Sequence, residues 1–294
     1  MSALQNVLVL MDTLACFEGI QFDTLHGGEF GEYIKNHREC HVLLPEDVEI
    51  LKQTSIVETK VSGKCKVTCE DTDTYTKACQ LYKELKPWEI DEPNRIMVLN
   101  FANPYIPGGG VRRGARAQEE DLCRRSSLLL SLETEEAKKY YSYNRKHTMK
   151  DEYGNEYGTN SMILTPFVEV IKDIHYKENV EYARLAVLTA AAPIIRDKWK
   201  VSEVYLDLMY QRISSMLYCA AAYGYTHLVL GAWGCGAFGN DPETVAELFC
   251  DVIDNFRYNR KDVHQLFETI SFAVPYNEKR PGNHLAFKIV FGEE

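Results

Sequence analysis

Apolar residues recur at two spacings along the chain, and each spacing predicts a different element. Apolar residues three and four apart share one helix face, whereas a short apolar run between turn residues is typical of a buried strand. The helical pattern predicts helices at residues 72–85, 118–132, 134–145, 201–223 and 242–256. The apolar runs predict strands at residues 95–101, 162–171, 185–191, 227–233, 269–274 and 287–291.

The two patterns alternate from about Thr72 to the carboxyl end. Such alternation predicts an α/β fold, in which helices pack on a mostly parallel or mixed sheet. Pro166 interrupts the run at residues 162–171, and proline within a sheet is typical of a bent or edge strand. Residues 153–161 are rich in turn formers and are expected to form a surface loop.

The first 70 residues are less regular. A helix near the start is expected to pack its apolar face on the core, and that face contains Leu4, Val7, Leu8, Met11, Leu14 and Ala15. Residues 55–61 and 64–70 could pair as an antiparallel addition to the sheet. No linker divides the chain, so we expect one domain over residues 1–294, with an accessory segment at 1–70 and a core at 71–294.

The N-terminal stretch lacks a basic leader, and Gln5, Asn6 and Asp12 interrupt it, which is unlike a signal peptide or a membrane span. The nine cysteines are dispersed and odd in number, as in a protein with reduced thiols. We therefore expect a cytoplasmic protein without a membrane partner. Cys65 and Cys69 have no second pair at zinc-site spacing, so no structural metal is expected. We also expect no cofactor.

The acidic composition narrows the possible ligands. The formal net charge is -10, whereas proteins that bind nucleic acids usually present a basic face to the phosphates. Sequence-specific nucleic-acid binding is therefore disfavoured. A small anionic ligand remains possible, because Arg112, Arg113 and Arg116 concentrate positive charge locally.

Three consecutive glycines, Gly108, Gly109 and Gly110, lie between a predicted strand and a predicted helix. Glycine adopts positive φ readily and leaves room for a ligand to approach the backbone. The same run could instead form only a tight turn. Asn103 precedes these glycines and is a candidate for ligand contact, although Pro104 holds it extended.

A second glycine-rich segment, residues 231–242, has the sequence GAWGCGAFGNDP and also lies between a strand and a helix. Asn240 or Asp241 can cap that helix, and Pro242 suits its first turn. Backbone amides at such a helix start can hold a diphosphate. The candidate ligand-binding residues here are Gly234, Cys235, Gly236, Ala237 and Phe238. The Phe238 ring could pack on a ribose or adenine, or could anchor the loop to the core.

The second segment also satisfies the G-x-G-x-x-G pattern of nicotinamide- and flavin-binding domains. That fingerprint expects an acidic residue about twenty positions later, at the end of the next strand. Here the position falls at Asp254, within a helical pattern. An oxidoreductase is therefore the weaker interpretation.

Gln118, Glu119 and Glu120 follow the three glycines after seven residues. Carboxylates are common at helix starts because they complement the helix dipole. Their position opposite a ligand loop favours a catalytic role instead. A ribosyl bond breaks through an oxocarbenium-like state, assisted by a carboxylic acid or by a carboxylate that orients water. The sequence leaves open whether the glutamate acts first as acid or as base.

The combination of GGG, seven residues, QEE and the distant GAWGCGAFGNDP resembles the bacterial-type poly(ADP-ribose) glycohydrolases of the macrodomain superfamily. The resemblance covers nearly the whole chain. Further matching stretches lie in the expected order: Asp12-Thr13-Leu14, VLNFA before the glycines, Tyr141-Ser142-Tyr143-Asn144, and FAVP at Ala273.

The resemblance implies a macrodomain-like α/β fold, with a mixed sheet between helices and an N-terminal helical and β extension. It implies a metal-independent hydrolase, a glycosidase in which Glu120 is catalytic and Glu119 contacts the distal ribose. Gln118 and Asn103 are further candidates for substrate contact. The residues expected to enclose the ribose and the diphosphate are Gly108 to Gly110 and Gly234 to Phe238.

One position departs from the family pattern. The family commonly has Asn directly before Pro-Gly-Gly-Gly, where it contacts ribose, and this chain has Ile106. The expected reaction is hydrolysis of poly(ADP-ribose), with ADP-ribose as product. The alternatives are hydrolysis of mono-ADP-ribosylated protein, or an ADP-ribose-binding module with weak catalysis, for which Ile106 is the motivating observation.

Overall fold

The computed structural model describes residues 1–17, 38–86, 95–197 and 200–292. A seven-stranded sheet with strand order β1-β6-β7-β3-β8-β11-β2 forms the centre of the molecule. Its strands are β1 (His41–Leu43), β2 (Lys66–Glu70), β3 (Ile96–Phe101), β6 (Met162–Lys172), β7 (Glu178–Ala190), β8 (His227–Leu230) and β11 (Thr269–Ala273). Two small hairpins pair β4 (Met149–Lys150) with β5 (Glu156–Gly158) and β9 (Arg257–Tyr258) with β10 (Lys261–Asp262).

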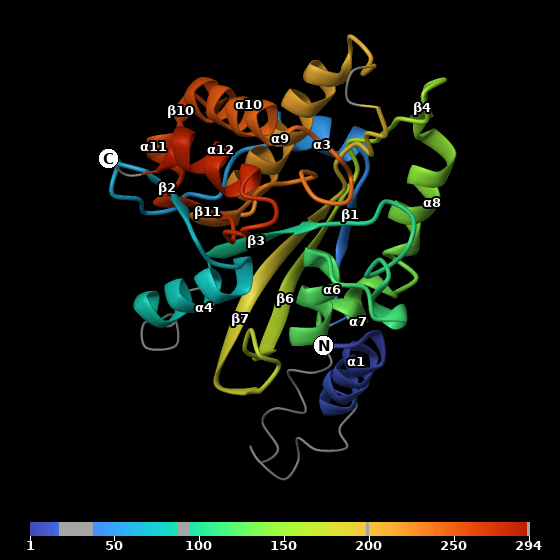
Figure 1. The fold of residues 1–294 in the computed structure, drawn as a ribbon. Helices are drawn as coiled ribbons and strands as arrows, with labels where there is room; N and C mark the ends of the chain where they lie inside the picture. The colour runs from blue at the N-terminus through green and yellow to red at the C-terminus, as the bar shows by residue number, and fades with distance from the viewer. Residues whose placement is uncertain (18–37, 87–94, 198–199, 293–294) are drawn as a thin grey trace.

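Helices cover both faces of this sheet (Figure 1). The described helices are α1 (Ala3–Phe17), α3 (Pro45–Leu51), α4 (Thr74–Leu85), the 3-10 turn η2 (Val111–Arg113), α6 (Gln118–Arg125), α7 (Leu128–Leu132), α8 (Lys138–His147), α9 (Tyr205–Ala222), α10 (Pro242–Asn255), α11 (Val263–Leu266) and α12 (Gly282–Phe291). None of the described helices is long and apolar enough to cross a membrane.

The sheet is mixed, as predicted. Strands β7, β3, β8, β11 and β2 pair in parallel, whereas β6 runs antiparallel to both β7 and β1. The register of β6 with β7 shifts between Thr165 and Val168. The expected bend at Pro166 is therefore confirmed, because proline cannot donate to a regular ladder.

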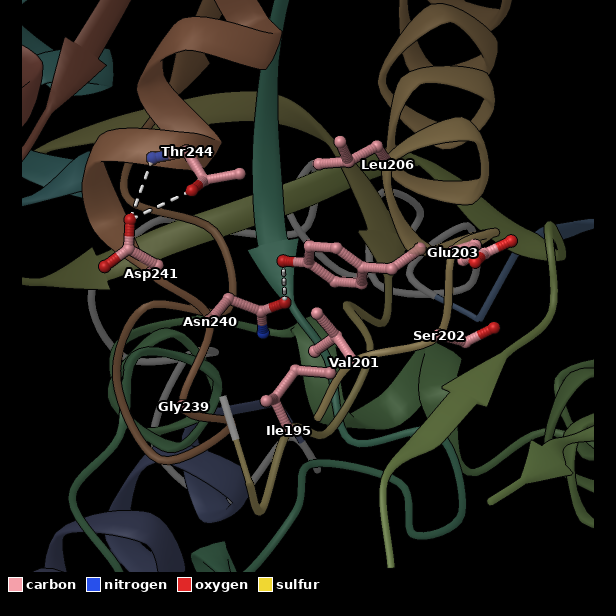
Figure 2. Close-up of a pocket in the computed structure, with 10 residues that line it drawn as sticks. Ile195, Val201, Ser202, Glu203, Leu206, Gly239, Asn240, Asp241 and Thr244 are labelled. Carbon is pink, nitrogen blue, oxygen red and sulfur yellow. Dashed lines mark hydrogen bonds between the residues drawn. The ribbon is translucent and has the colours of Figure 1, made fainter. Parts of the chain in front are cut away.

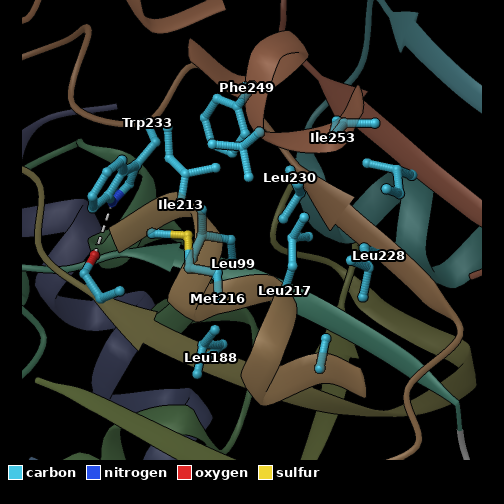
Figure 3. Close-up of a cluster of buried hydrophobic side chains, with 14 of the residues drawn as sticks. Leu99, Leu188, Ile213, Met216, Leu217, Leu228, Leu230, Trp233, Phe249 and Ile253 are labelled. Atoms are coloured by element: carbon cyan, nitrogen blue, oxygen red, sulfur yellow. Dashed lines mark hydrogen bonds between the residues drawn. The ribbon is translucent and has the colours of Figure 1, made fainter. Parts of the chain in front are cut away.

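Alternate residues of the central strands enter two separate cores, because successive strand side chains point to opposite faces. Leu99, Leu188 and Leu230 pack with α9 and α10 in the larger core, which Figure 3 shows. Val98 and Val229 join the smaller core, to which α1, α4, α6 and α7 contribute residues. The predicted mixed sheet between helices is thus confirmed.

The predicted strand at residues 287–291 is wrong, because these residues belong to helix α12. Phe287 and Phe291 are both buried, and their spacing of four places them on one helix face. A short apolar run alone does not distinguish a strand from a buried helix.

Two further expectations also need correction. Residues 66–70 form β2, which pairs in parallel with β11, and residues 55–61 form no strand. The helix predicted at residues 118–132 is broken into α6 and α7. The break lies at Ser126 and Ser127, where Ser126 bridges to Val170 of β6.

Helix α1 exists but buries a different face from the one predicted. Leu4, Leu8 and Met11 are 69%, 55% and 61% exposed, whereas Asn6 and Thr13 are buried. Apolar spacing failed here because both buried polar side chains have hydrogen-bond partners inside the protein, which offsets the cost of burying them.

Asp73 connects three elements on the smaller-core side of the sheet. Its carboxylate accepts from the Thr76 amide at 3.0 Å, which caps α4, and from Arg125 Nη1 of α6 at 2.6 Å. Arg125 also donates to the Lys172 carbonyl at the end of β6, at 3.2 Å. Burial raises the pKa of Asp73, but the Arg125 charge and the Thr76 hydrogen bonds outweigh it, so the pKa lies below its usual value.

We predict that Asp73→Asn lowers the free energy of unfolding at neutral pH by about 1–3 kcal/mol, since a charge-assisted hydrogen bond is lost. The contribution of Asp73 is present above its unfolded pKa and disappears as the pH falls through its lowered folded pKa. The free energies of unfolding of the two proteins should therefore become equal in strongly acidic solution. Urea unfolding across pH measures this, and a difference that persists unchanged in acid would contradict it.

Candidate active site

The two glycine loops meet at the carboxyl edge of the sheet. The first glycine loop (residues 102–117) follows β3 and the second glycine loop (residues 231–241) follows β8, and these strands are adjacent and parallel. A Cβ atom on Gly231 would lie 2.9 Å from the Phe101 ring, so the loops begin in contact. The fold therefore brings the two glycine loops together, as the sequence predicted.

Gly109 lies directly against both glutamates. Its φ is +58°, and a Cβ atom there would lie 2.5 Å from Glu120 Oε1 and 3.0 Å from Glu119 Oε2. A side chain at this position would displace the carboxylates as well as strain the backbone. Gly108 has a φ of +62°, and its missing side chain would instead meet Leu129 of the core at 2.7 Å.

Gln118 joins the start of α6 to the end of β3. Its Oε1 accepts from the Phe101 amide at 2.9 Å, and its Nε2 donates to the Leu99 carbonyl at 2.8 Å. A third bond runs from Nε2 to Thr74 Oγ1 at 3.2 Å. These bonds occupy both atoms of the Gln118 side-chain amide, which the sequence suggested for substrate contact. Gln118 instead positions the two glutamates that follow it.

Glu119 is buried in the first turn of α6, with 2% of its surface exposed. Its Oε2 accepts from the Asn103 amide at 2.7 Å, and its Oε1 accepts from Asn100 Nδ2 at 3.3 Å. Burial raises its pKa to about 8; the Asn103 hydrogen bond opposes this shift and the neighbouring Glu120 charge adds to it. Glu119 is therefore mainly protonated at neutral pH.

Glu120 presents one fixed and one unpaired oxygen. Its Oε1 accepts from the Gly110 amide at 2.7 Å, which fixes the carboxyl group against the first glycine loop. Its Oε2 is buried and has no hydrogen-bond partner among the described residues. Unpaired buried polar atoms are rare because they cost free energy, and they are often found where a reactant supplies the missing partner.

Asn103 and Ile106 form the outer turn of the first glycine loop. The Asn103 side-chain oxygen accepts from the amides of Tyr105 and Ile106, at 2.8 and 3.0 Å. This oxygen is thus engaged in a local turn and does not replace the side chain that the family has at position 106. The Ile106 side chain itself is 44% exposed.

Buried contacts fix the base of the second glycine loop. Trp233 is buried and its Nε1 donates to the Ala190 carbonyl at 2.9 Å. The Asn240 Nδ2 donates to the carbonyls of Pro193 and Gly234, at 2.7 and 3.0 Å, and its Oδ1 accepts from the Tyr205 hydroxyl at 2.7 Å. Asp241, rather than Asn240, caps α10.

The tip of the second glycine loop is more open. Gly236 and Ala237 are exposed, and a Cβ atom on Gly236 would have no neighbour within 4 Å. Within the described part of the chain, the amides of Gly236, Ala237 and Phe238 have no hydrogen-bond acceptor. Three free consecutive amides can bind an anion. Cys235 is half-buried, and burial raises the pKa of its thiol, so it is an unreactive neutral group.

A pocket of about 290 Å³ lies on the α9 and α10 side of the second glycine loop (Figure 2). Ile195, Val201, Tyr205, Gly239 and Asn240 are among the residues that line it. Neither glutamate lines it, and none of Gly234 to Phe238 does. This pocket therefore lies behind the loop, away from the carboxyl groups.

Asn100 is a site residue that was not among the residues predicted from the sequence. It is fully buried in β3, and its Nδ2 bonds both Glu119 Oε1 and Thr189 Oγ1 of β7, at 3.3 and 3.2 Å. The sequence did contain a signal for such a role, because Asn100 is the one polar residue in the apolar run IMVLNF. A buried polar residue needs a partner, and here the partner is a site carboxyl.

The arginines near the glutamates divide into two groups. Arg124 and Arg125 are buried and bind structural partners, among them the Ala115 carbonyl and Asp73. Arg112 pairs with Glu133 on the surface, while Arg113 and Arg116 are exposed. Among the residues that the structure describes, no group of three His, Cys, Asp or Glu side chains could hold a metal ion.

Comparison with known proteins places this geometry in a family. The family model described as the catalytic domain of microbial-type poly(ADP-ribose) glycohydrolase (PARG) matches residues 23–173, just over half of the chain. A search of curated proteins found no significant match.

Several solved structures resemble the chain along most of its length. PARG from Thermomonospora curvata is 26% identical, with a TM-score of 0.77 and coverage of 98% of this chain and 99% of that one. PARG from Deinococcus radiodurans in complex with ADP-ribose is 30% identical, with a TM-score of 0.69 and coverage of 87% and 95%. The Thermomonospora enzyme bound to the inhibitor ADP-HPD is 26% identical, with a TM-score of 0.74 and coverage of 97% and 98%. By both the family match and these structures, the chain belongs to the microbial-type poly(ADP-ribose) glycohydrolases.

Proposed function

We propose that this chain hydrolyses the ribosyl O-glycosidic bond of poly(ADP-ribose), releases ADP-ribose, and uses Glu120 as its catalytic residue. The observation that carries the assignment is the Glu120 carboxyl group, with Oε1 fixed by the Gly110 amide and Oε2 buried without a partner. A fixed carboxyl with one available oxygen can transfer a proton to or from a reacting group.

In the proposed reaction, the Glu120 carboxyl protonates the bridging oxygen as the bond between the ribosyl carbon and that oxygen breaks. The resulting carboxylate then takes a proton from the attacking water, whose oxygen bonds to the ribosyl carbon. One water is consumed, Glu120 returns to its starting form, and the polymer is shorter by one ADP-ribose. In this proposal Glu120 therefore acts first as acid and then as base.

The neighbouring groups suit substrate binding. Glu119 has a pKa of about 8, and a protonated carboxyl can donate a hydrogen bond to a ribose hydroxyl and adds no negative charge beside a diphosphate. The free amides of Gly236, Ala237 and Phe238 suit the diphosphate itself. Gly108 to Gly110 leave space for the ribose to approach the backbone.

The whole chain, residues 1–294, is proposed to act as one macrodomain-type unit, and mono-ADP-ribosylated protein is a second possible substrate. The reduced state of the nine cysteines favours a cytoplasmic location. Product sizing after incubation with polymer and with mono-ADP-ribosylated protein distinguishes the two substrates.

Glu120→Gln should reduce the turnover of poly(ADP-ribose) by about 10²- to 10⁴-fold, the usual worth of general acid–base assistance. Calorimetry should show that ADP-ribose still binds, because the amide keeps the size of the carboxyl. Glu135→Gln, which changes an exposed glutamate that pairs with Lys138, is the matched control. If Glu120→Gln stays active while Glu119→Gln does not, the assignment within the pair is wrong.

Glu119 should make the ligand-free protein less stable as the pH rises. Its folded pKa of about 8 lies above the ordinary value of 4.5, so its stabilising contribution is complete below the ordinary value and is lost as the pH passes through about 8. Relative to Glu119→Gln, the unmodified protein should therefore lose free energy of unfolding between about pH 5 and about pH 8. If the free energies of unfolding of the two proteins change in parallel with pH, the pKa of Glu119 is not raised.

Ile106→Asn should raise polymer hydrolysis by about 2- to 10-fold if a missing ribose hydrogen bond limits the enzyme, since one such bond contributes about 0.5–1.5 kcal/mol. The exposed position makes a change in melting temperature unexpected. An unchanged rate would mean that the missing contact is not limiting. If the unmodified chain retains labelled polymer without shortening it, the chain is instead an ADP-ribose-binding module.

A further inference from the structure

Helix α1 lies against the segment that carries the active-site glycines. It packs on η2 and on α6, the two elements on either side of residues 114–117. Figure 1 shows α1 beside α6 and α7. The helix also lies before residues 23–173, the part of the chain that the family model matches. We propose that α1 is a positioning element of the active site, in which Asn6 and Thr13 hold the first glycine loop in register with Glu120.

Asn6 makes the direct contact with the loop. Its side chain is 2% exposed, and its Nδ2 donates to the Gly114 carbonyl at 2.9 Å. Gly114 has a φ of +77°, and a Cβ atom there would lie 2.3 Å from the Ala3 carbonyl oxygen. The backbones of α1 and the loop are therefore in contact, and any side chain at Gly114 would push them apart.

Two hydrogen bonds connect this contact to the catalytic carboxyl. Ala115, the residue after Gly114, donates its amide to the Gly110 carbonyl at 3.2 Å. Gly110 in turn donates its own amide to Glu120 Oε1 at 2.7 Å. Gly110 thus connects two contacts: its carbonyl binds Ala115, next to the residue that α1 contacts, and its amide orients the Glu120 carboxyl group.

Thr13 supplies a second path from the same helix. Its hydroxyl donates to the Arg124 carbonyl at 2.6 Å, and Arg124 Nη1 donates to the Ala115 carbonyl at 2.7 Å. Both side chains are buried, at 0% and 1% exposure. Ala115 is therefore held from α6 while its neighbour Gly114 is held from α1.

A buried lysine anchors α1 to the sheet. Lys172, at the end of β6, donates its Nζ to Thr13 Oγ1 at 2.9 Å and pairs with Asp12. Because α1 is bonded to β6 of the sheet, it can restrain the first glycine loop. A helix with no contact except the loop could not restrain it. These contacts explain why the polar residues Asn6 and Thr13 can lie on the buried face of α1, beside the buried Leu10.

The experiment compares Asn6→Ala and Thr13→Val with the unmodified chain. Thr13→Val keeps the side-chain shape and removes only the hydroxyl, so it tests the path even if Asn6→Ala folds poorly. This inference rests on the proposed hydrolysis for its kinetic measurement. We expect the kcat for poly(ADP-ribose) to fall by about 10- to 100-fold in Asn6→Ala, the usual cost of a small misplacement, with KM changing less than about threefold.

Two control variants separate positioning from general destabilisation. Leu8→Ala changes the exposed face of α1 and should leave kcat unchanged. Ile253→Ala removes buried methyl groups near the carboxyl end of α10, in the other core, and should lower the melting temperature without lowering kcat well below that temperature.

Hydrogen exchange of the amides at residues 108–117 gives a second measurement that does not depend on catalysis. Faster exchange in Asn6→Ala and Thr13→Val than in Ile253→Ala supports the proposal, as does a fall in kcat confined to the α1 variants. Unchanged kcat and unchanged amide exchange in both Asn6→Ala and Thr13→Val overturn the proposal. An equal fall in kcat and an equal rise in exchange in Ile253→Ala also overturn it. If the unmodified chain shortens no polymer, the proposed hydrolysis fails and exchange alone decides whether α1 positions the loop.

Discussion

The close approach of the Gly109 backbone to two carboxyl groups is the contact on which the site depends. A Cβ atom there would lie within 3.0 Å of an oxygen of Glu119 and of Glu120, so the loop and the helix start approach this closely only because the residue is glycine. The surrounding bonds maintain the approach. Gln118 fixes the start of α6 to β3, and the Gly110 amide fixes Glu120. The geometry of the candidate site therefore depends on the backbone as much as on the side chains.

Two buried carboxyl groups this close together also impose an electrostatic constraint. Burial penalises each charge, and a charge on one raises the cost of a charge on the other. The structure relieves the conflict unequally. Glu119, deeper and bound to Asn100 and Asn103, has its pKa raised to about 8 and is mainly neutral. In the proposed reaction, Glu119 holds a sugar hydroxyl and Glu120 transfers the proton.

Local patterns predicted the main helices, the mixed sheet and the two loops because each depends on spacing within a few residues. Features that depend on partners distant in sequence were missed. The buried face of α1 includes Asn6 and Thr13, whose partners Gly114 and Arg124 lie more than a hundred residues away. Asn100 and Gln118 likewise acquire their roles only when β3 and α6 meet. A polar residue in an apolar pattern was the available signal, but it does not identify its partner.

The position of β3 in the sheet has a consequence for how the site forms. Its neighbours β7 and β8 both come later in the chain, and Asn100 bonds Thr189 across 89 residues of sequence. Contacts this distant are slow to form because the intervening chain must first lose its freedom. During synthesis β3 and the two glutamates emerge long before β7 and β8, so β3 first lacks both of its neighbours in the sheet. The candidate active site is thus assembled late, and a chain interrupted before β8 would carry Glu119 and Glu120 without the second glycine loop.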